Sequence, residues 1–159
     1  EVNPEATVEV VWTFTWFGPE AETQAANALL EKGADVLAQH QDSTATGLAA
    51  EAAGAKWISY NTAYGQDSAP EAFVTAPVWD WGPYYVNIVE QIIDGTFTTE
   101  SYWGGMETGL VSLYDLSSDV PSDTATLIAE KTEAIIDGTL EVEVVEEEFI
   151  SNVIGTVNP

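Results

Sequence analysis

Strand-like apolar runs alternate with helical patterns along the first 95 residues, and this alternation limits the fold more than any other feature. Each run is short, and most are rich in β-branched or aromatic residues, as buried strands are. Parallel neighbours in a sheet need a crossover helix between them. We therefore predict an α/β fold with a parallel sheet flanked by helices. The predicted strands are 8–14, 34–38, 56–60 and 72–78.

Cap residues and glycines delimit the predicted helices. Gly33 and Gly54 stop the first two, and Pro83 opens a third that Gly95 ends. Asp42 or Ser43 is expected to cap the second helix. The sides expected to face the sheet are Ala21, Ala25, Ala26, Leu29 and Leu30 in the first helix, and Leu48, Ala49, Ala52 and Ala53 in the second. A looser region follows, with a strand predicted at 108–116 and a helix at 123–137.

The charge of the chain excludes several partners. It has 27 acidic residues against 3 cationic ones, which gives a formal net charge of -24. Such a surface repels nucleic acid and anionic lipid. Repulsion between like charges is screened over roughly 10 Å at 0.1 M salt but about 3 Å at 1 M. We therefore infer a halophilic protein that loses structure on dilution into low salt. The alternative is a merely acidic protein from a low-salt environment.

Loops after the four predicted strands are rich in aromatic and hydrogen-bonding residues. In open α/β sheets ligands bind outside the carboxyl ends of the strands. Flat rings beside a few polar groups suit a planar heterocycle or a sugar. The residues in question are Trp16, Phe17, Tyr64, Trp79 and Trp81, together with Gln39, His40, Gln41, Asp42, Ser43, Asn61 and Asp80.

Each of these residues also has a purely structural interpretation. Trp79 and Trp81 lie two apart, so one or both can be core residues on an extended chain. Asp42 and Asp80 can cap the helices that follow them. His40, the single His, is more typical of a hydrogen-bonded structural residue than of a catalyst. Asn61 at a strand end can simply hold a turn.

Patterns typical of enzymes are missing from the sequence. It contains no glycine-rich phosphate loop, no GxSxG motif and no His and carboxylate cluster with metal spacing. With 0 Cys it has no thiolate nucleophile or thiolate metal ligand. We expect no catalytic activity, no metal and no cofactor. An enzyme that uses Asp42 and His40 as acid and base is the minor alternative.

Two blocks in order resemble a known family. The segments "KGADVLAQHQDS" and "WDWGPYY", the latter followed by "DGTF" and "YWGG", are similar to the basic membrane protein (BMP) family of ABC-transporter substrate-binding proteins. The resemblance covers roughly residues 7–140. It implies a type I periplasmic-binding-protein fold, in which two α/β lobes close on a ligand and deliver it to an ABC permease. Family ligands are mostly purine bases or nucleosides, with riboflavin in one branch.

The resemblance also implies a set of ligand-binding residues. They are Trp16 and Phe17, where an aromatic stacks on the base; Gln41, Asp42 and Ser43, which line the cleft; and Asn61 and Trp79. This chain departs from the family at three positions. Gly18 stands where the family commonly has Asp, Asn61 where nucleoside binders often have an Asp that holds ribose, and Trp79 where they often have Lys. These departures favour a free base or another flat ligand with fewer hydroxyls.

The match begins at what would be the second lobe, so an N-terminal lobe is expected as a partner outside this chain. Accordingly we assign 1–82 to the α/β core of the C-terminal lobe, 83–140 to a crossover and return segment that contacts the other lobe, and 141–159 to an acidic, strand-like tail. Helix 83–95 and the strand near 108–113 are expected to expose apolar faces, and the piece alone to self-associate.

The predicted function is an extracytoplasmic solute-binding protein of an ABC importer. The resemblance implies a lipoprotein anchor at the outer face of the membrane in the full-length protein, as in archaeal and Gram-positive members. The alternatives are a ligand-sensing or surface-interaction module without transport, or a different flat ligand such as a flavin or a sugar.

Overall fold

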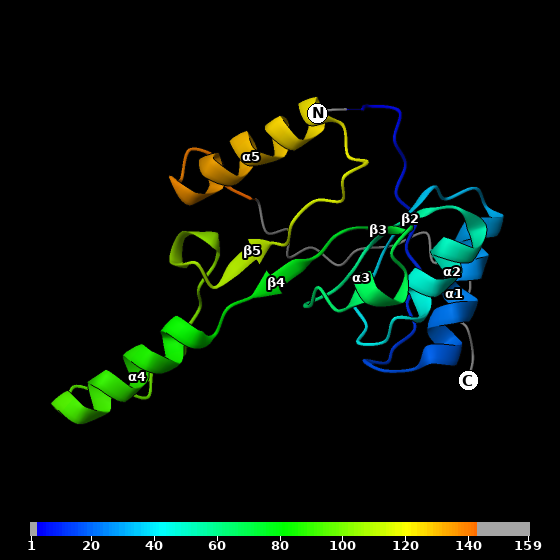
Figure 1. The fold of residues 1–159 in the computed structure, drawn as a ribbon. Coiled ribbons are helices and arrows are strands. Elements are labelled where there is room, and N and C mark those ends of the chain that lie inside the picture. The colour runs from blue at the N-terminus through cyan, green and yellow to red at the C-terminus, as the bar shows by residue number, and fades with distance from the viewer. Residues whose placement is uncertain (1–2, 143–159) are drawn as a thin grey trace. The chain divides into compact units, whose positions relative to one another are not determined.

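The computed structural model describes residues 3–142, which group into two units (Figure 1). Unit 1 comprises residues 3–60 and 64–73, and unit 2 comprises residues 61–63 and 74–142. Most of the acidic tail predicted at 141–159 lies outside the described residues. The boundaries predicted at residues 82 and 140 stay predictions.

A three-stranded sheet has its first two strands in unit 1, and its third strand begins there and continues into residues of unit 2. Its order is β1 (Val36–Ala38), β2 (Lys56–Ile58) and β3 (Phe73–Thr75). Strands β1 and β2 are parallel, with Leu37 opposite Trp57. Helix α1 (Pro19–Glu31) packs against α2 (Ala45–Ala53), and α2 contacts both β1 and β2. The predicted α/β class, a parallel sheet flanked by helices, is confirmed.

Trp57 is the centre of the core of unit 1. Its side chain is fully buried, and Phe73 meets its ring edge-on at a centroid distance of 6.1 Å. Two glycines make room for the indole, one in α2 and one at the start of α3 (Gly65–Ser68). A Cβ atom would lie 2.3 Å from the Trp57 ring at Gly47 and 2.4 Å from it at Gly65. Trp57 therefore sets how closely both helices approach the sheet.

The same indole explains why the predicted inner face of α2 is wrong. The buried residues of this helix are Ala45, Thr46, Gly47 and Ala50, whereas Leu48 is exposed. A large ring at the interface selects the face with the smallest side chains, which hydrophobicity alone does not identify. In α1 the prediction holds better, since Ala25 and Ala26 are buried.

Residues 8–14 are not a strand, which corrects the first predicted element. They show no ladder pairing, and Val8, Val10, Trp12 and Phe14 are exposed. Side chains hold the segment instead, through a Gln41 to Thr13 hydrogen bond and a Lys32–Glu9 salt bridge of 3.3 Å. β-branched residues favour extended backbone, but they do not supply the neighbouring strand that a ladder needs.

Unit 2 contains a two-stranded antiparallel ladder and two long helices. Strand β4 (Pro77–Trp79) pairs with β5 (Val111–Leu113), and Trp79 lies opposite Val111. The helices are α4 (Gly82–Asp94) and α5 (Ser122–Ile136), with a 3-10 turn, η1 (Met106–Thr108), before β5. Both helices lie close to their predicted bounds, and Gly95 ends α4 in the left-handed conformation as expected.

The predicted strand 72–78 is divided between the two sheets. Its first part is β3 and its last part is β4, with Ala76 between them. Pro77 has no N–H to donate, which interrupts a continuous ladder at this point. From Ala76 onward the chain bonds to the β5 segment, as in the 2.9 Å bond from the Tyr114 N–H to the Ala76 carbonyl. The strand predicted at 108–116 is accordingly reduced to three residues.

Candidate functional site

The loop that follows β1 is held from the inside by Gln39. This side chain is buried, and its amide nitrogen donates to the backbone carbonyls of Gln41 and Ser43 at 2.7 and 2.6 Å. Its amide oxygen accepts a hydrogen bond from the indole N–H of Trp57 at 3.1 Å. The core of unit 1 therefore fixes the shape of the loop that contains Gln41, Asp42 and Ser43.

A backbone hydrogen bond brings this loop beside the aromatic loop that precedes α1. The Asp42 N–H donates to the Trp16 carbonyl at 2.8 Å. The Trp16 and Phe17 side chains are 71% and 65% exposed, so their rings are available to a ligand. Within unit 1 the structure thus brings together Trp16, Phe17, Gln41, Asp42 and Ser43.

Two of these predicted ligand contacts are engaged within the protein. The Gln41 amide donates to the Thr13 hydroxyl at 2.9 Å, and the Ser43 hydroxyl donates to Glu22 at 2.5 Å. Ser43 also accepts the Ala45 N–H at 3.2 Å in the first turn of α2. Asp42 does not cap this helix, and among residues 3–142 we see no hydrogen bond to its exposed carboxylate. Of the three predicted contacts in this loop, Gln41, Asp42 and Ser43, only Asp42 is exposed.

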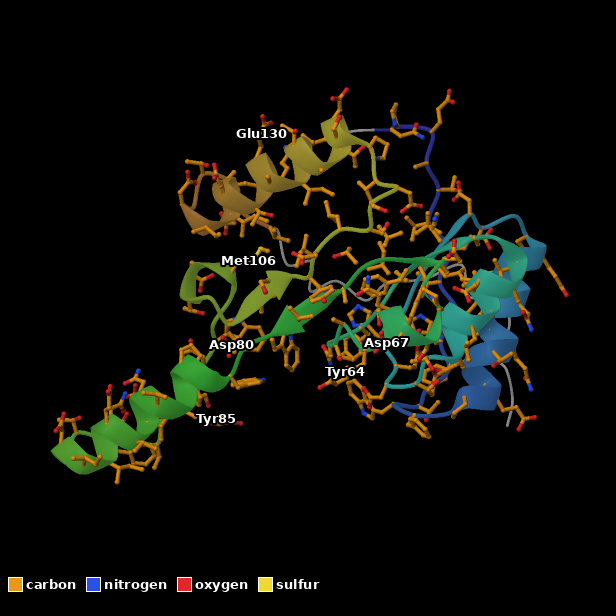
Figure 2. All side chains as sticks on the ribbon, in the orientation of Figure 1. Tyr64, Asp67, Asp80, Tyr85, Met106 and Glu130 are labelled. Atoms are coloured by element: carbon orange, nitrogen blue, oxygen red, sulfur yellow. The ribbon has the colours of Figure 1, made fainter. Side chains whose placement is uncertain are left out.

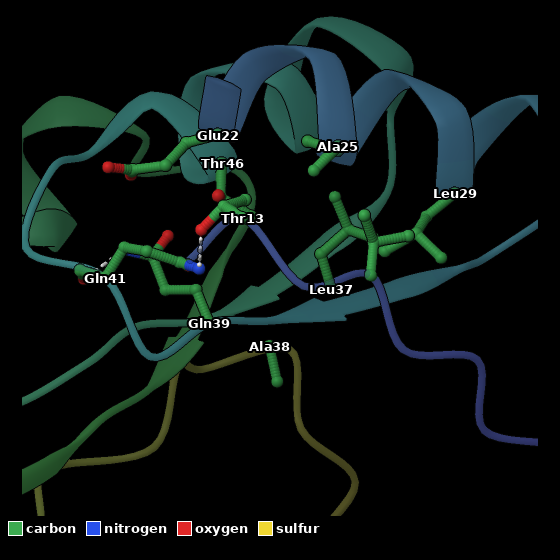
Figure 3. Close-up of a pocket in the computed structure, with 11 residues that line it drawn as sticks. Thr13, Glu22, Ala25, Leu29, Leu37, Ala38, Gln39, Gln41 and Thr46 are labelled. Atoms are coloured by element: carbon green, nitrogen blue, oxygen red, sulfur yellow. Dashed lines mark hydrogen bonds between the residues drawn. The ribbon is translucent and has the colours of Figure 1, made fainter. Parts of the chain in front are cut away.

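A small cavity lies behind the loop (Figure 3). Its volume is about 40 Å³. Thr13, Glu22, Gln39, Gln41 and Thr46 provide its polar lining, and Val11, Ala25, Ala26, Leu29, Leu37 and Ala38 the rest. Ligand pockets usually exceed about 300 Å³, so this space suits ordered water. The surface that unit 1 offers to a ligand is therefore the exposed aromatic loop and not this cavity.

Glu22 is the residue of this region that the sequence did not reveal. It is 1% exposed, and it accepts hydrogen bonds from Ser43 and, at 2.9 Å, from the Gly18 N–H. In a sequence, a carboxylate near the start of a helix is usually interpreted as an exposed charge that interacts favourably with the helix dipole. The capping-box pattern does not reveal it either, because that pattern places the carboxylate three residues after the capping position and Glu22 stands four after Gly18.

The other two predicted contacts belong to unit 2. Asn61 has a positive φ of 60°, in the left-handed region that Asn tolerates better than most residues, and it forms an isolated bridge with Val78. This conformation agrees with a turn-forming role. Trp79 follows Val78 and is 48% exposed. The bridge therefore places Asn61 next to the strand that presents Trp79.

Trp79 is the exposed end of a chain of aromatic rings in unit 2. The Trp81 ring meets it edge-on at 6.0 Å and stacks on Tyr85 at 6.2 Å. Tyr84 contacts Trp81 and stacks on Tyr102 at 4.3 Å. The Asp80 carboxylate accepts the Gly82 N–H at 2.9 Å and so bends the chain into α4 (Figure 2). Asp80 therefore shapes the turn before α4 but does not cap the helix, whose N-cap residue is Trp81, which corrects the capping prediction. Trp81 packs against Trp79.

Two further aromatic residues, His40 and Tyr64, lie in the loops of unit 1. His40 is exposed and packs on Tyr60 at a ring distance of 4.9 Å. Tyr64 is 82% exposed (Figure 2). Among the described residues no group of His, Asp and Glu is arranged to hold a metal ion. The geometry of unit 1 suits stacking and hydrogen bonding to a flat molecule.

Fold and sequence together place the chain in a family of ABC-transporter substrate-binding proteins. The chain belongs to the Bmp family, described as ABC transporter substrate-binding protein PnrA-like, whose pattern matches residues 1–146. This family is one of solute-binding proteins. The resemblance found in the sequence is confirmed.

Individual relatives agree with this assignment. The chain is 41% identical over 140 residues to a purine-binding protein of Brucella abortus, and 39% identical over 141 residues to a putative ABC transporter glucose-binding protein of Haloferax volcanii. It also resembles the solved structure of an ABC transporter solute-binding protein from Conexibacter woesei, with 26% identity and a TM-score of 0.72 over 89% of this chain.

The chain spans less than half the length of these relatives. It covers 38% of the Brucella protein, 36% of the Haloferax protein and 48% of the Conexibacter chain. The match to the Brucella protein covers 85% of this chain, and the match to the Haloferax protein covers 89% of it. No helix within residues 3–142 has the length and apolar character needed to cross a bilayer.

Proposed function

We propose that this protein is the solute-binding component of an ABC importer and that its ligand is a purine base or nucleoside. The observation that supports this most directly is the 41% identity to a purine-binding protein within the same family. Trp16 and Phe17, exposed beside Asp42, supply the chemistry: an aromatic face for the ring, and an acceptor for its exocyclic or ring N–H groups.

The residues proposed to contact the ligand are Trp16, Phe17, Gln41, Asp42, Ser43, Asn61 and Trp79. Stacking on an aromatic side chain contributes roughly 0.5 to 1.5 kcal/mol beyond the area it buries. Two such contacts and a few hydrogen bonds are compatible with micromolar binding, which corresponds to about 8 kcal/mol. Asn61 and Trp79, in place of Asp and Lys, favour the base over the nucleoside.

Isothermal titration calorimetry in molar salt tests this proposal, with adenine, adenosine and guanosine as ligands. Trp16→Ala should weaken binding by more than about tenfold, because it removes the exposed stacking face. Glu130→Ala is the control, since this side chain lies on an exposed face of α5 (Figure 2) and should leave affinity unchanged. The titrations use the protein with both lobes present, and failure of all three ligands to bind it would rule out the purine assignment.

A sugar is the second candidate, and the Haloferax relative favours it. That protein is described as a putative glucose-binding protein, and its identity of 39% nearly equals that of the purine binder. Exposed Trp rings stack on sugars as well as on bases. Glucose in the same titrations separates the two: heat with glucose and none with purines would select the sugar.

The remaining assignments follow from the family and the composition. We propose an ABC permease as the protein partner, a further lobe that completes the ligand cleft, and a location outside the cytoplasmic membrane with a lipid anchor. A net charge of -24 supports operation in molar salt, where surface repulsion is screened. Genes for a permease and an ATPase beside the coding sequence would support transport over a sensing role.

A further inference from the structure

The buried carboxylate of Glu22 joins two segments that are far apart in the sequence. One oxygen, Oε1, accepts the Gly18 N–H at 2.9 Å, and the other, Oε2, accepts the Ser43 hydroxyl at 2.5 Å. Gly18 and Ser43 lie at the starts of α1 and α2 respectively. A single side chain that is 1% exposed therefore connects the segments that lead into both helices.

Helix capping explains only one of these bonds. Gly18 is the residue before α1, and its N–H gains an acceptor from Glu22, one position beyond the carboxylate of a capping box. The bond from Ser43 contributes nothing to the cap, because it arrives from 21 residues away in the chain. The second bond therefore serves to hold the two loops together.

The connections close into a ring. From Trp16 the chain runs through Phe17 to Gly18, whose N–H reaches Glu22. Glu22 accepts the Ser43 hydroxyl, and Ser43 follows Asp42, whose N–H returns to the Trp16 carbonyl at 2.8 Å. A closed ring of three hydrogen bonds and two short backbone segments allows less independent movement than any one bond would.

Stability alone is a poor reason to bury a carboxylate at this place. Removing a charge from water is costly, and an apolar side chain of similar size often stabilises a fold equally well. The surroundings include Ala25 and Ala26, which would accommodate such a side chain. The ring of hydrogen bonds has a clearer effect on geometry, since it fixes the loop of Trp16 and Phe17 relative to the loop of Asp42 and Ser43.

We propose that Glu22 is a positioning residue of the ligand site, which holds Trp16 and Phe17 in register with Asp42. This inference rests on the proposed function, because those side chains are assigned to the ligand there. Glu22 itself touches no ligand, since its carboxylate is buried and both oxygens are engaged.

Glu22→Met tests the inference in the full chain in molar salt. Met keeps the length and volume of the side chain but removes both acceptor oxygens. We expect the Kd for adenine to rise about tenfold. The Asp42 amide should also exchange its hydrogen about tenfold faster, because its bond to Trp16 is part of the ring. Adenine binding with unchanged affinity would overturn the positioning role.

Two matched variants test whether the loss of affinity in Glu22→Met comes from the missing hydrogen bonds or from the missing charge. Glu22→Gln keeps an acceptor for Gly18 and can donate to Ser43, so its Kd should stay within about threefold of the unaltered protein. Glu20→Met makes the same replacement at an exposed position in the first turn of α1 and should change neither Kd nor exchange. An equal loss of affinity in Glu20→Met would show that charge, and not the ring, is responsible.

Hydrogen exchange keeps the inference separate from the proposed function. A protein that binds no purine would overturn the function, and the Asp42 amide would still decide whether the ring exists. If Glu22→Met does not fold, Ser43→Ala removes the hydroxyl that joins Glu22 to the loop of Asp42 and Ser43. Faster exchange at Asp42 in that variant supports the ring, and unchanged exchange refutes it.

Discussion

Unit 1 and unit 2 bury their apolar side chains to very different extents. In unit 1 Trp57 and Phe73 are 0% and 1% exposed, and small residues of α1 and α2 pack tightly in the same region. In unit 2 neither α4 nor α5 contains a buried residue. The proposed ligand loops of unit 1 are therefore supported by a packed core, whereas the helices of unit 2 leave apolar surface uncovered.

Helix α4 shows the difference most clearly. It is amphipathic, yet Val86, Val89, Ile92 and Ile93 are all more than half exposed, with Ile93 at 77%. An isolated helix of this length is marginal in water, because tertiary packing supplies most helical stability. Leu113 on β5 is also exposed. The expectation of apolar faces on helix 83–95 and near 108–113 is therefore confirmed.

The largest effect should come from salt, and it should affect the two units unequally. Dilution from molar salt to about 0.1 M lengthens the screening distance to roughly 10 Å and restores repulsion among the acidic groups. We expect loss of helical circular dichroism, with amides of α4 and α5 exchanging before those of β1 and β2. A melting temperature that is the same at both salt concentrations would contradict this.

A change at Gly47 should destabilise unit 1 selectively. The added methyl of Gly47→Ala would lie 2.3 Å from the Trp57 ring, and neither backbone nor indole has free space to move into. Overpacking of this kind costs about 3 kcal/mol, which urea denaturation in molar salt would detect. Leu48→Ala, at the neighbouring and 51% exposed position of α2, is the control and should cost much less.

A moderate effect is expected from the apolar face of α4. The double variant Val89→Ser and Ile93→Ser removes two exposed apolar side chains. It should reduce binding of an apolar dye and lower any self-association in analytical ultracentrifugation, because both depend on exposed apolar area. Equal dye binding by the variant would place the accessible apolar surface elsewhere.

The smallest effect concerns Asp137 after α5. Hydrogen bonds from the Thr139 hydroxyl, at 2.6 Å, and then from the Thr139 N–H, at 2.9 Å, hold the pKa of this exposed carboxyl below its ordinary value of 3.8. A lowered pKa stabilises the folded state above pH 3.8, and this contribution disappears as the pH falls through the lower folded value. In Thr139→Val the pKa of Asp137 should rise, as measured by carboxyl NMR titration, and the small stability that the hydroxyl bond adds above pH 3.8 should be lost, at neutral pH as well.

The sequence predicted those parts of the fold that depend on local chemistry. Pro83 and Gly95 bounded α4 correctly, and Gly33 and Gly54 marked the ends of α1 and α2. Properties that depend on distant residues were not predictable in the same way. Strand pairing at 8–14 requires a neighbour, and the buried face of α2 depends on the bulk of Trp57, which is contributed by another element.

The residues of the candidate site likewise differ in whether local sequence or distant contacts determine their role. Trp16, Phe17 and Trp79 were proposed from the sequence because aromatic residues near the ends of predicted strands can be recognised from residue type alone. The structure exposes all three, and their contact with a ligand stays a prediction. Glu22 was missed because, in a chain with 27 acidic residues, one more carboxylate on a helix carries no signal. Its role depends on burial and on a bond to Ser43, neither of which appears in a local pattern.

The burial of Trp57 gives the protein a built-in optical probe. Trp57 is 0% exposed and bonded to Gln39, whereas Trp16, Trp79 and Trp103 are 71%, 48% and 98% exposed. An aqueous quencher such as acrylamide therefore reaches the exposed indoles first and leaves emission dominated by the core of unit 1. Lifetime measurements on that residual emission would follow the core and the loop attached to it, while emission lost to the quencher would report on the rings proposed to meet the ligand.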